Sequence, residues 1–209
     1  MEQTNWTQVL ADAGVLWRMN YEAEGAHAEL TSGKHSDGYC NCAKIVEDPE
    51  LVAKVAAGII AKLQSVLGDV KPDWVVGPAY GAITFAHEVA KQLGTKFGFT
   101  EIEYTDTGKM QVLKRFDIPE NAKVLVIEDV VTTGGSALKT VTTLTDIGVT
   151  VLPYVGIILN WSGQTNIGEY TLVPLIDAKM NVYEPVECPL CAKGAPAVRP
   201  KSHWHELAR

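Results

Sequence analysis

Short apolar runs rich in β-branched residues alternate with segments of helical periodicity through most of this chain. The segments between several runs, such as residues 83–93 and 136–146, place apolar side chains at helical spacing. Strands that alternate with helices favour a parallel sheet that is covered by helices on both faces. The sequence therefore predicts an α/β fold. The principal strands are expected at residues 74–76, 96–102, 123–127, 149–158 and 170–174.

The two ends of the chain have a different pattern. Residues 6–18 are expected to form a helix, and residues 27–46 to form a strand–turn–strand region around the loop-forming stretch SGKHSDG. The length of 209 residues suits one domain with small additions. We expect one domain over residues 1–209, with an N-terminal part at 1–46, a core at 47–180 and a C-terminal extension at 181–209.

Composition narrows the classes of function. Hydrophobic residues make up 46% of the chain, which is enough for a core, and the net charge is −7. An acidic chain is a poor candidate for general nucleic-acid binding, which needs clustered Lys and Arg. The longest apolar stretches are too short to span a bilayer, and the N-terminus does not resemble a signal peptide. We therefore expect no nucleic-acid partner, no membrane partner and a cytoplasmic location.

The stretch 124–136, VLVIEDVVTTGGS, carries the strongest chemical signal. A buried strand runs into Glu128 and Asp129, and a polar glycine turn follows at the start of a helix. Adjacent carboxylates repel each other, so hydroxyl donors or a cation such as Mg²⁺ would relieve them. The glycine turn and the helix start can present backbone N–H groups to a phosphate.

A tight connection between a strand and a helix could explain the glycine turn alone. A solvated strand end could explain the paired acids alone. Both halves together, in this order and at a strand-to-helix junction, favour a site for a phosphorylated sugar. Ligands of parallel sheets bind at the carboxyl ends of the strands, which is where this junction lies.

The stretch 124–136 resembles, at every position, the phosphoribosyl diphosphate (PRPP) signature of the type I phosphoribosyltransferases. Three further segments are similar to the short-lid orotate phosphoribosyltransferases of that family. They are LTSGKHSDGYCN at 30–41, VVGPAYGA at 75–82 and the tail with ECPLC. The resemblance implies the type I phosphoribosyltransferase fold, a twisted parallel sheet flanked by helices with a small N-terminal hood.

The resemblance also implies a reaction. The phosphoribosyl group of PRPP would pass to a ring nitrogen of a nucleobase, orotate above all, releasing pyrophosphate and forming a nucleoside 5′-monophosphate in pyrimidine biosynthesis. Mg²⁺ would be the cofactor. A homodimer would be the assembly.

Roles follow for individual residues from the same resemblance. Glu128 and Asp129 would hold the ribose hydroxyls, and Lys114 and Arg115 would act as catalytic cations in or beside a lid. The residues that would wrap the 5′-phosphate are Thr132, Thr133, Gly134, Gly135 and Ser136. The residues that would meet the pyrophosphate are Gly77, Pro78, Ala79, Tyr80 and Gly81. The base pocket would include Thr31, Tyr39, Cys40 and Trp161.

The sequence departs from the orotate pattern in the segment after the late strand. Those enzymes often carry Asp-Arg where this chain has Asn160 and Trp161, so an arginine that could pair with the carboxylate of orotate is absent at that position. Two alternatives therefore stay open. One is a phosphoribosyltransferase for another purine or pyrimidine, and the other is a non-catalytic PRPP-sensing regulatory protein.

The four cysteines lie in two close pairs, which is not the pattern of a disulfide framework. Cys188 and Cys191, together with His203 and His205, could bind zinc, although reduced thiols are the simpler interpretation. Cys40 and Cys42 are expected to pack on one side of a strand.

Overall fold

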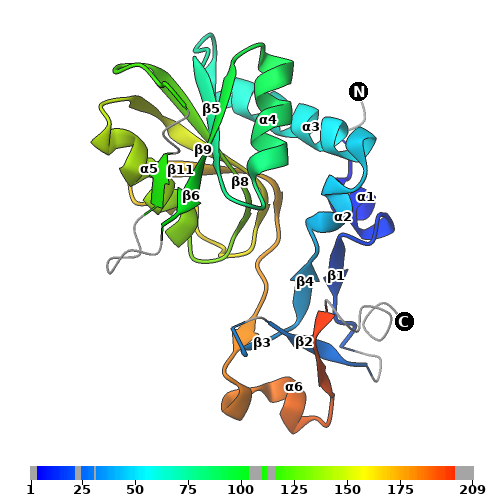
Figure 1. Ribbon diagram of the computed structural model, residues 1–209. Coiled ribbons are helices and arrows are strands. Elements are labelled where there is room, and N and C mark those ends of the chain that lie inside the picture. Colours follow the sequence, from blue (N-terminus) through cyan, green and yellow to red (C-terminus); the bar gives the residue numbers. More distant parts are fainter. Residues whose placement is uncertain (1–3, 22–24, 31, 104–109, 113–115, 201–209) are drawn as a thin grey trace. The chain divides into compact units, whose positions relative to one another are not determined.

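The computed structural model describes residues 4–21, 25–30, 32–103, 110–112 and 116–200 (Figure 1). By internal contacts the chain divides into two compact units. The smaller unit joins residues 1–44 to residues 179–209, and the larger unit contains residues 45–178. The single-domain organisation expected from the sequence stays a prediction.

A seven-stranded sheet forms the centre of the larger unit, in the order β10-β11-β9-β8-β5-β6-β7. Strands β11, β9, β8, β5 and β6 run parallel, and β10 and β7 pair antiparallel at the two edges. The predicted α/β class with a mostly parallel sheet is therefore confirmed. The strand bounds are β5 Trp74–Pro78, β6 Lys96–Ile102, β7 Met110–Val112, β8 Lys123–Val131, β9 Thr150–Asn160, β10 Asn166–Ile167 and β11 Tyr170–Asp177.

Three helices cover this sheet, and their ends follow local sequence signals. They are α3 (Pro49–Leu67), α4 (Ile83–Leu93) and α5 (Gly135–Asp146). Asp48 caps α3 by accepting hydrogen bonds from the backbone N–H groups of Glu50 (3.0 Å) and Leu51 (3.2 Å). Helix α4 ends at Gly94, which adopts the left-handed conformation at φ 64°.

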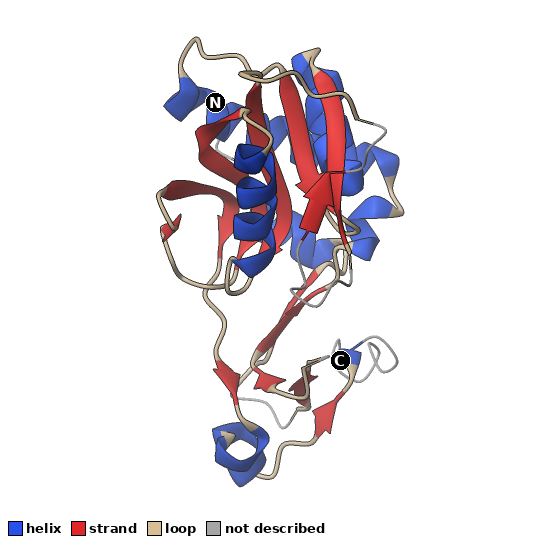
Figure 2. Ribbon diagram, turned by 60° about the vertical axis from the view of Figure 1, so that its left-hand side comes forward, coloured by secondary structure: helices blue, strands red, loops and turns tan. Residues whose placement is uncertain are grey.

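Helices lie on both sides of the sheet (Figure 2). Because side chains alternate along a strand, β8 contributes to both layers. Val124 and Val126 share a buried cluster with Val141 and Leu144 of α5. On β9, a Cβ atom added to Gly156 would lie 2.7 Å from Ile127 Cδ1 and 2.9 Å from Leu63 Cδ1, so α3 packs closely on the other face.

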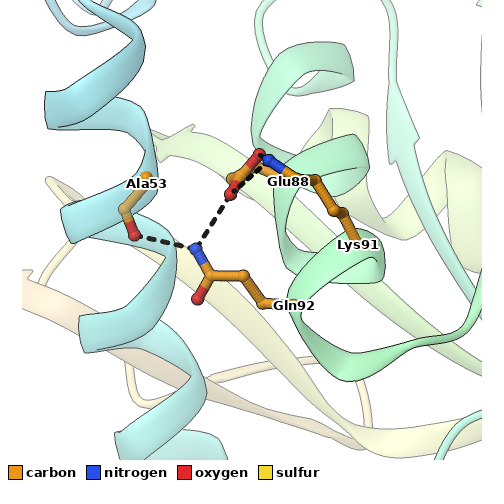
Figure 3. A network of polar contacts seen from close by, with 4 residues as sticks. All are labelled: Ala53, Glu88, Lys91 and Gln92. Carbon is orange, nitrogen blue, oxygen red and sulfur yellow. Dashed lines mark hydrogen bonds and ion pairs between the residues drawn. The ribbon is translucent and has the colours of Figure 1, made fainter.

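A polar network joins α3 to α4 (Figure 3). Gln92 Nε2 donates to the carbonyl oxygen of Ala53 on α3 (2.9 Å) and to Glu88 Oε1 (3.0 Å). Lys91 Nζ lies 3.1 Å from Glu88 Oε2. The hydrogen bond from Gln92 is the main reason that the pKa of Glu88 is lowered.

The smaller unit contains two small sheets. Strand β1 (Leu16–Arg18) pairs antiparallel with β4 (Gly38–Cys40). The second sheet has the order β12-β3-β2-β13 and combines the two ends of the chain. Its strands are β2 His27–Glu29, β3 His35–Ser36, β12 Val182–Tyr183 and β13 Ala197–Val198. The short helices are α1 Trp6–Asp12, α2 Ala43–Val46 at the boundary of the units, η1 Pro185–Glu187 and α6 Pro189–Ala192.

Asp37 links the C-terminal extension to the N-terminal part of the smaller unit through hydrogen bonds. Its carboxylate accepts hydrogen bonds from Tyr21 Oη (2.6 Å), from Asn181 N (2.9 Å) and from Asn181 Nδ2 (2.7 Å). Burial, followed by this contact with Asp37, raises the pKa of Tyr21.

The helix expected over residues 6–18 is wrong in its second half. Helix α1 ends at Asp12, and Gly14 adopts a left-handed conformation at φ 68°. Such a glycine stops a helix, because the chain changes direction there. Among the described residues, no helix combines the length and the hydropathy that a bilayer crossing requires.

Candidate active site

The acidic pair lies inside the last part of β8. The sequence predicted that this strand ends at Ile127, but it continues through both acids to Val131. Glu128 lies opposite Ile157 of the parallel strand β9 and is only 4% exposed. A carboxyl group this buried is unusual and has to be compensated by its neighbours or by a ligand.

The neighbouring groups compensate only part of the cost of burying the Glu128 carboxyl group. Its Oε1 accepts a hydrogen bond from the backbone N–H of Asp129 (3.2 Å), whereas Oε2 has no hydrogen-bond partner among the described residues. Burial raises the pKa of Glu128 well above its usual value, and the negative charge of Asp129 raises it further. The nearby Ser136 side chain acts in the opposite direction on this pKa. The protein therefore holds a carboxyl group that a hydroxyl donor or a cation would stabilise.

The glycine turn that follows β8 leads directly into α5. Gly134 is the N-cap residue of α5 in a left-handed conformation at φ 81°, and an added Cβ would collide with the Ile167 side chain. In the described part of the chain, no side chain caps this helix start by a hydrogen bond. Four of the five predicted phosphate-binding residues are exposed around it, namely Thr132, Thr133, Gly135 and Ser136. The first N–H groups of α5 are thus placed as an anion site requires.

The turn between β5 and α4 approaches the acidic pair. A Cβ added to Gly81 would lie 2.7 Å from Asp129 Cγ and closer still to Oδ2. Gly77 is equally restricted, because a Cβ there would lie 3.0 Å from the Cβ atoms of Ala82 and Ala86. Tyr80, at the tip of the turn, is 87% exposed. The structure therefore brings two predicted PRPP-binding segments, 77–81 and 128–136, together through Gly81 and Asp129.

The acidic pair also meets the chemical requirement for a magnesium site. Mg²⁺ takes oxygen ligands and is commonly bound through one or two carboxylates together with substrate phosphates. The unpartnered Oε2 of Glu128 and the neighbouring carboxylate of Asp129 supply such oxygens. Ribose hydroxyls would satisfy the same atoms.

A cavity of about 830 Å³ lies at the opposite edge of the sheet. Its lining includes Asp73, Lys96 and Ala122, which lie at or next to the amino ends of β5, β6 and β8. Ligands of parallel sheets bind at the carboxyl ends of the strands. This cavity is therefore separate from the candidate site.

Several predicted site residues lie elsewhere or outside the described residues. Thr31, Lys114 and Arg115 are outside them. Tyr39 and Cys40 belong to β4 of the smaller unit. Since the structure describes the two units separately, the base pocket that would combine β4 with the larger unit stays a prediction.

Trp161 directly follows β9 and lies next to the end of β8. Its backbone N–H donates to the carbonyl oxygen of Val131 (2.9 Å), and its side chain is 7% exposed. The indole Nε1 is buried with no hydrogen-bond partner among the described residues. Buried donors normally have a hydrogen-bond partner. The place of Trp161 in a base pocket stays a prediction.

Sequence reasoning missed a cluster in the smaller unit. Cys188 and Cys191 lie beside His27 and His35, whereas the predicted partners His203 and His205 fall outside the described residues. The available signal was His27 at the start of the predicted strand–turn–strand region and His35 within its loop-forming stretch. Only the pairing of distant segments could have connected them to the cysteines.

The fold and site define an enzyme class that handles a phosphorylated sugar, because an acidic pair and an open helix start meet at the carboxyl edge of a parallel sheet. A model of the phosphoribosyl transferase domain matches residues 43–173. The chain belongs to the phosphoribosyltransferase family and is an enzyme of the glycosyltransferase type.

Individual relatives extend the match over nearly the whole chain. The chain is similar to the orotate phosphoribosyltransferase of Caldicellulosiruptor bescii, with 38% identity over 176 residues, 84% of this chain and 88% of that protein. It is 36% identical over 202 residues to the orotate phosphoribosyltransferase of a Thermoanaerobacter species, covering 97% of this chain and 98% of that protein.

A solved structure agrees at the level of the fold. The crystal structure of orotate phosphoribosyltransferase from Aeropyrum pernix has a TM-score of 0.65 and 23% identity, covering 81% of this chain and 92% of that one. The resemblance inferred from the sequence and the fold that it implied are both confirmed.

Proposed function

We propose that this enzyme transfers the phosphoribosyl group of PRPP to orotate, forming orotidine 5′-monophosphate and pyrophosphate. The observation that carries the proposal is the meeting of three features around Glu128 and Asp129. They are the buried Glu128 beside the half-buried Asp129, the open start of α5 and the turn at Gly81. The Thermoanaerobacter relative named orotate phosphoribosyltransferase, which matches 97% of this chain, favours orotate as the base.

Each part of PRPP has a matching group in the protein. The ribose hydroxyls would donate to the carboxylates of Glu128 and Asp129, which relieves the buried Oε2 of Glu128. The 5′-phosphate would accept hydrogen bonds from the backbone of residues 132–136 at the start of α5. Backbone groups of residues 77–81 would contact the pyrophosphate.

The reaction breaks the bond between the anomeric carbon and pyrophosphate and forms a bond from that carbon to a ring nitrogen of the base. Holding both reactants in this geometry is the principal contribution of the protein. Mg²⁺ would neutralise the charge of the leaving pyrophosphate, and Glu128 and Asp129 are the side chains that fit it. Lys114 and Arg115 are proposed to add positive charge near the leaving group.

A phosphoribosyltransferase for a less charged base is the second candidate. The observation that favours it is Trp161, which takes the sequence position where orotate phosphoribosyltransferases often carry an arginine that could pair with the carboxylate of orotate. An indole can stack on any planar base but cannot neutralise a carboxylate.

We further propose that Mg²⁺ is the cofactor, that the enzyme is a homodimer and that it works in the cytoplasm. These assignments depend on the family resemblance. A reducing compartment also agrees with the four cysteines, all described, which form no disulfide in the structure.

A panel of bases tests the proposal. The full-length chain is mixed with PRPP, Mg²⁺ and orotate, uracil, adenine, hypoxanthine or xanthine, and the release of pyrophosphate is followed. We expect release with orotate and formation of orotidine 5′-monophosphate. If pyrophosphate is released with a different base and not with orotate, that base is the substrate and the orotate assignment is wrong. Binding of PRPP without turnover on any base would favour the sensor alternative.

A further inference from the structure

We infer that the smaller unit contains a structural zinc site formed by His27, His35, Cys188 and Cys191. The ligand atoms of these four side chains lie within 4.8 Å of one another. Four nitrogen and sulfur ligands without an open position are typical of structural zinc. The site lies outside the PRPP-binding segments and is independent of the base that the enzyme uses.

The strand register of the hairpin places the two histidines together. In the antiparallel pair β2–β3, Glu29 lies opposite His35 and Ala28 lies opposite Ser36. His27 is two residues before Glu29, so His27 and His35 are diagonal neighbours on one face. Their rings meet edge to face with centroids 4.8 Å apart.

The connection between β12 and β13 supplies the two cysteines. These strands form opposite edges of the four-stranded sheet, so the chain between them has to pass from one edge to the other. That connection contains η1 and α6, with Cys188 directly before Pro189 and Cys191 near the end of α6. Leu190, between the cysteines, is only 2% exposed and anchors the connection.

Four of the six distances between ligand atoms lie close to those of a tetrahedral metal site. His27 Nε2 lies 3.0 Å from His35 Nδ1, 3.6 Å from Cys188 Sγ and 3.5 Å from Cys191 Sγ. His35 Nδ1 lies 3.2 Å from Cys191 Sγ. Zinc bonds of about 2.3 Å to sulfur and about 2.0–2.1 Å to nitrogen imply separations of roughly 3.3–3.8 Å between ligand atoms in a tetrahedron. The four side chains therefore need only small shifts to surround one ion.

The chemistry of the ligand set selects zinc. Tetrahedral sites with two sulfur and two nitrogen ligands favour zinc among the common divalent metals. His27 is fully buried, and a metal ion binds the neutral form of an imidazole. Among the described residues, the polar contacts of the His27 ring lie on Nε2, inside the cluster, and its Nδ1 has no hydrogen-bond partner.

A metal at this position would have a clear structural purpose. Each strand pair of the four-stranded sheet is only two residues long in its register, so the backbone ladders contribute little. Small units of this kind commonly depend on a metal or a disulfide for stability. A bound zinc ion would crosslink the C-terminal extension to the N-terminal hairpin.

Metal analysis of the full-length chain tests this inference. The protein is produced with zinc in the medium, dialysed against metal-free buffer and measured by elemental mass spectrometry. We expect about one zinc ion per chain, coordinated by two sulfur and two nitrogen atoms in X-ray absorption spectra. Replacement of the metal by Co²⁺ should produce thiolate-to-cobalt absorption bands, a readout that needs no variant.

Matched variants locate the ligands. The double variant Cys188→Ser/Cys191→Ser should lose the zinc. The control Cys40→Ser/Cys42→Ser should retain it, although the Sγ atoms of that pair also lie only 3.4 Å apart in the same unit. The variant His203→Asn/His205→Asn should retain it as well.

Three outcomes would overturn the inference. They are a wild-type chain that binds far less than one zinc after reconstitution and shows no cobalt–thiolate bands, full zinc retention in Cys188→Ser/Cys191→Ser, and loss of zinc in either of the other two double variants.

Discussion

The carboxylate of Asp129 occupies the space that a side chain at Gly81 would fill. Gly81 follows β5 and Asp129 lies within β8, and these are neighbouring parallel strands. Only a residue without a Cβ atom lets the turn after β5 come this close to the acidic pair. The contact therefore explains how the turn that we propose to bind pyrophosphate and the acids that we propose to bind ribose could act on one ligand.

The substitution Gly81→Ala should separate these two segments. Its Cβ would lie 2.7 Å from Asp129 Cγ, so the turn or the carboxylate has to move. We expect PRPP to bind at least about tenfold more weakly, which is about 1.4 kcal/mol, as measured by titration calorimetry. Gly98→Ala is the matched control, because its Cβ would make only ordinary contacts at 3.6 Å and should leave PRPP affinity unchanged. If Gly81→Ala binds PRPP as tightly as Gly98→Ala does, the lack of a side chain at Gly81 is not needed for PRPP binding.

Glu128→Gln should stabilise the protein without ligand at neutral pH. The pKa of Glu128 is raised in the folded state, mainly by burial. Its favourable contribution is therefore complete below the unfolded pKa of about 4.3 and is lost as the pH rises through the folded pKa. At pH 7–8 the variant should be more stable by roughly 1.4 kcal/mol for each unit by which the folded pKa exceeds the unfolded one, because the amide carries no charge that burial disfavours.

Urea denaturation from pH 4 to pH 8 measures this difference. The gap between the variant and the wild type should widen as the pH rises, whereas the exposed acid variant Glu120→Gln should follow the wild type. A variant that is less stable than the wild type at pH 8 would contradict the burial argument.

Gly134 and Gly135, in the turn that we propose to bind the 5′-phosphate, should respond differently to substitution by alanine. Gly134 has φ 81° and would collide with Ile167, so Gly134→Ala should cost more than about 1 kcal/mol of folding stability. At Gly135 an added Cβ would meet only Thr133 Oγ1 at 3.6 Å, so Gly135→Ala should be neutral or slightly stabilising. Thermal unfolding of both variants decides the point, and similar melting temperatures would be inconsistent with the geometry.

The network between α3 and α4 predicts a pH effect of the opposite sign (Figure 3). The pKa of Glu88 is lowered in the folded state, chiefly by the hydrogen bond from Gln92. Its contribution is therefore present above the unfolded pKa and is lost as the pH falls through the folded pKa. At pH 7, Glu88→Gln should cost roughly 0.5–1 kcal/mol, and the loss should disappear in acid.

Chemical denaturation of wild type and Glu88→Gln between pH 2 and pH 7 measures the effect. The companion variant Gln92→Ala should weaken the same pH dependence, because it removes the main cause of the lowered pKa. A pH-independent difference between wild type and Glu88→Gln would show that the ionised carboxylate is not what the network stabilises.

Local sequence signals predicted the larger unit and the junction between β8 and α5 well. The strand into Glu128 and Asp129, the turn at Gly134 and the helix after it depend on neighbours in the chain. The same locality explains the wrong ending of the first helix, since residues 16–18 fit a helical pattern but pair with β4 instead. Pairing with a distant strand overrides local periodicity.

Contacts between distant segments could not be predicted from one sequence. The approach of Gly81 to Asp129 depends on which strands become neighbours, and the cluster of His27 and His35 with the two cysteines depends on a chain that returns to the N-terminal hairpin. In both places the sequence supplied the residue types but not the register that brings them together.

Calorimetric titration of PRPP with Mg²⁺ into the wild type and into Glu128→Gln/Asp129→Asn tests the proposed site most directly. Both amides keep the shape of the side chains but lose the negative charge that ribose hydroxyls and a cation would meet. We predict a folded variant whose PRPP affinity falls at least about tenfold. A folded variant that binds PRPP as tightly as the wild type would contradict the assignment of Glu128 and Asp129 to the ribose.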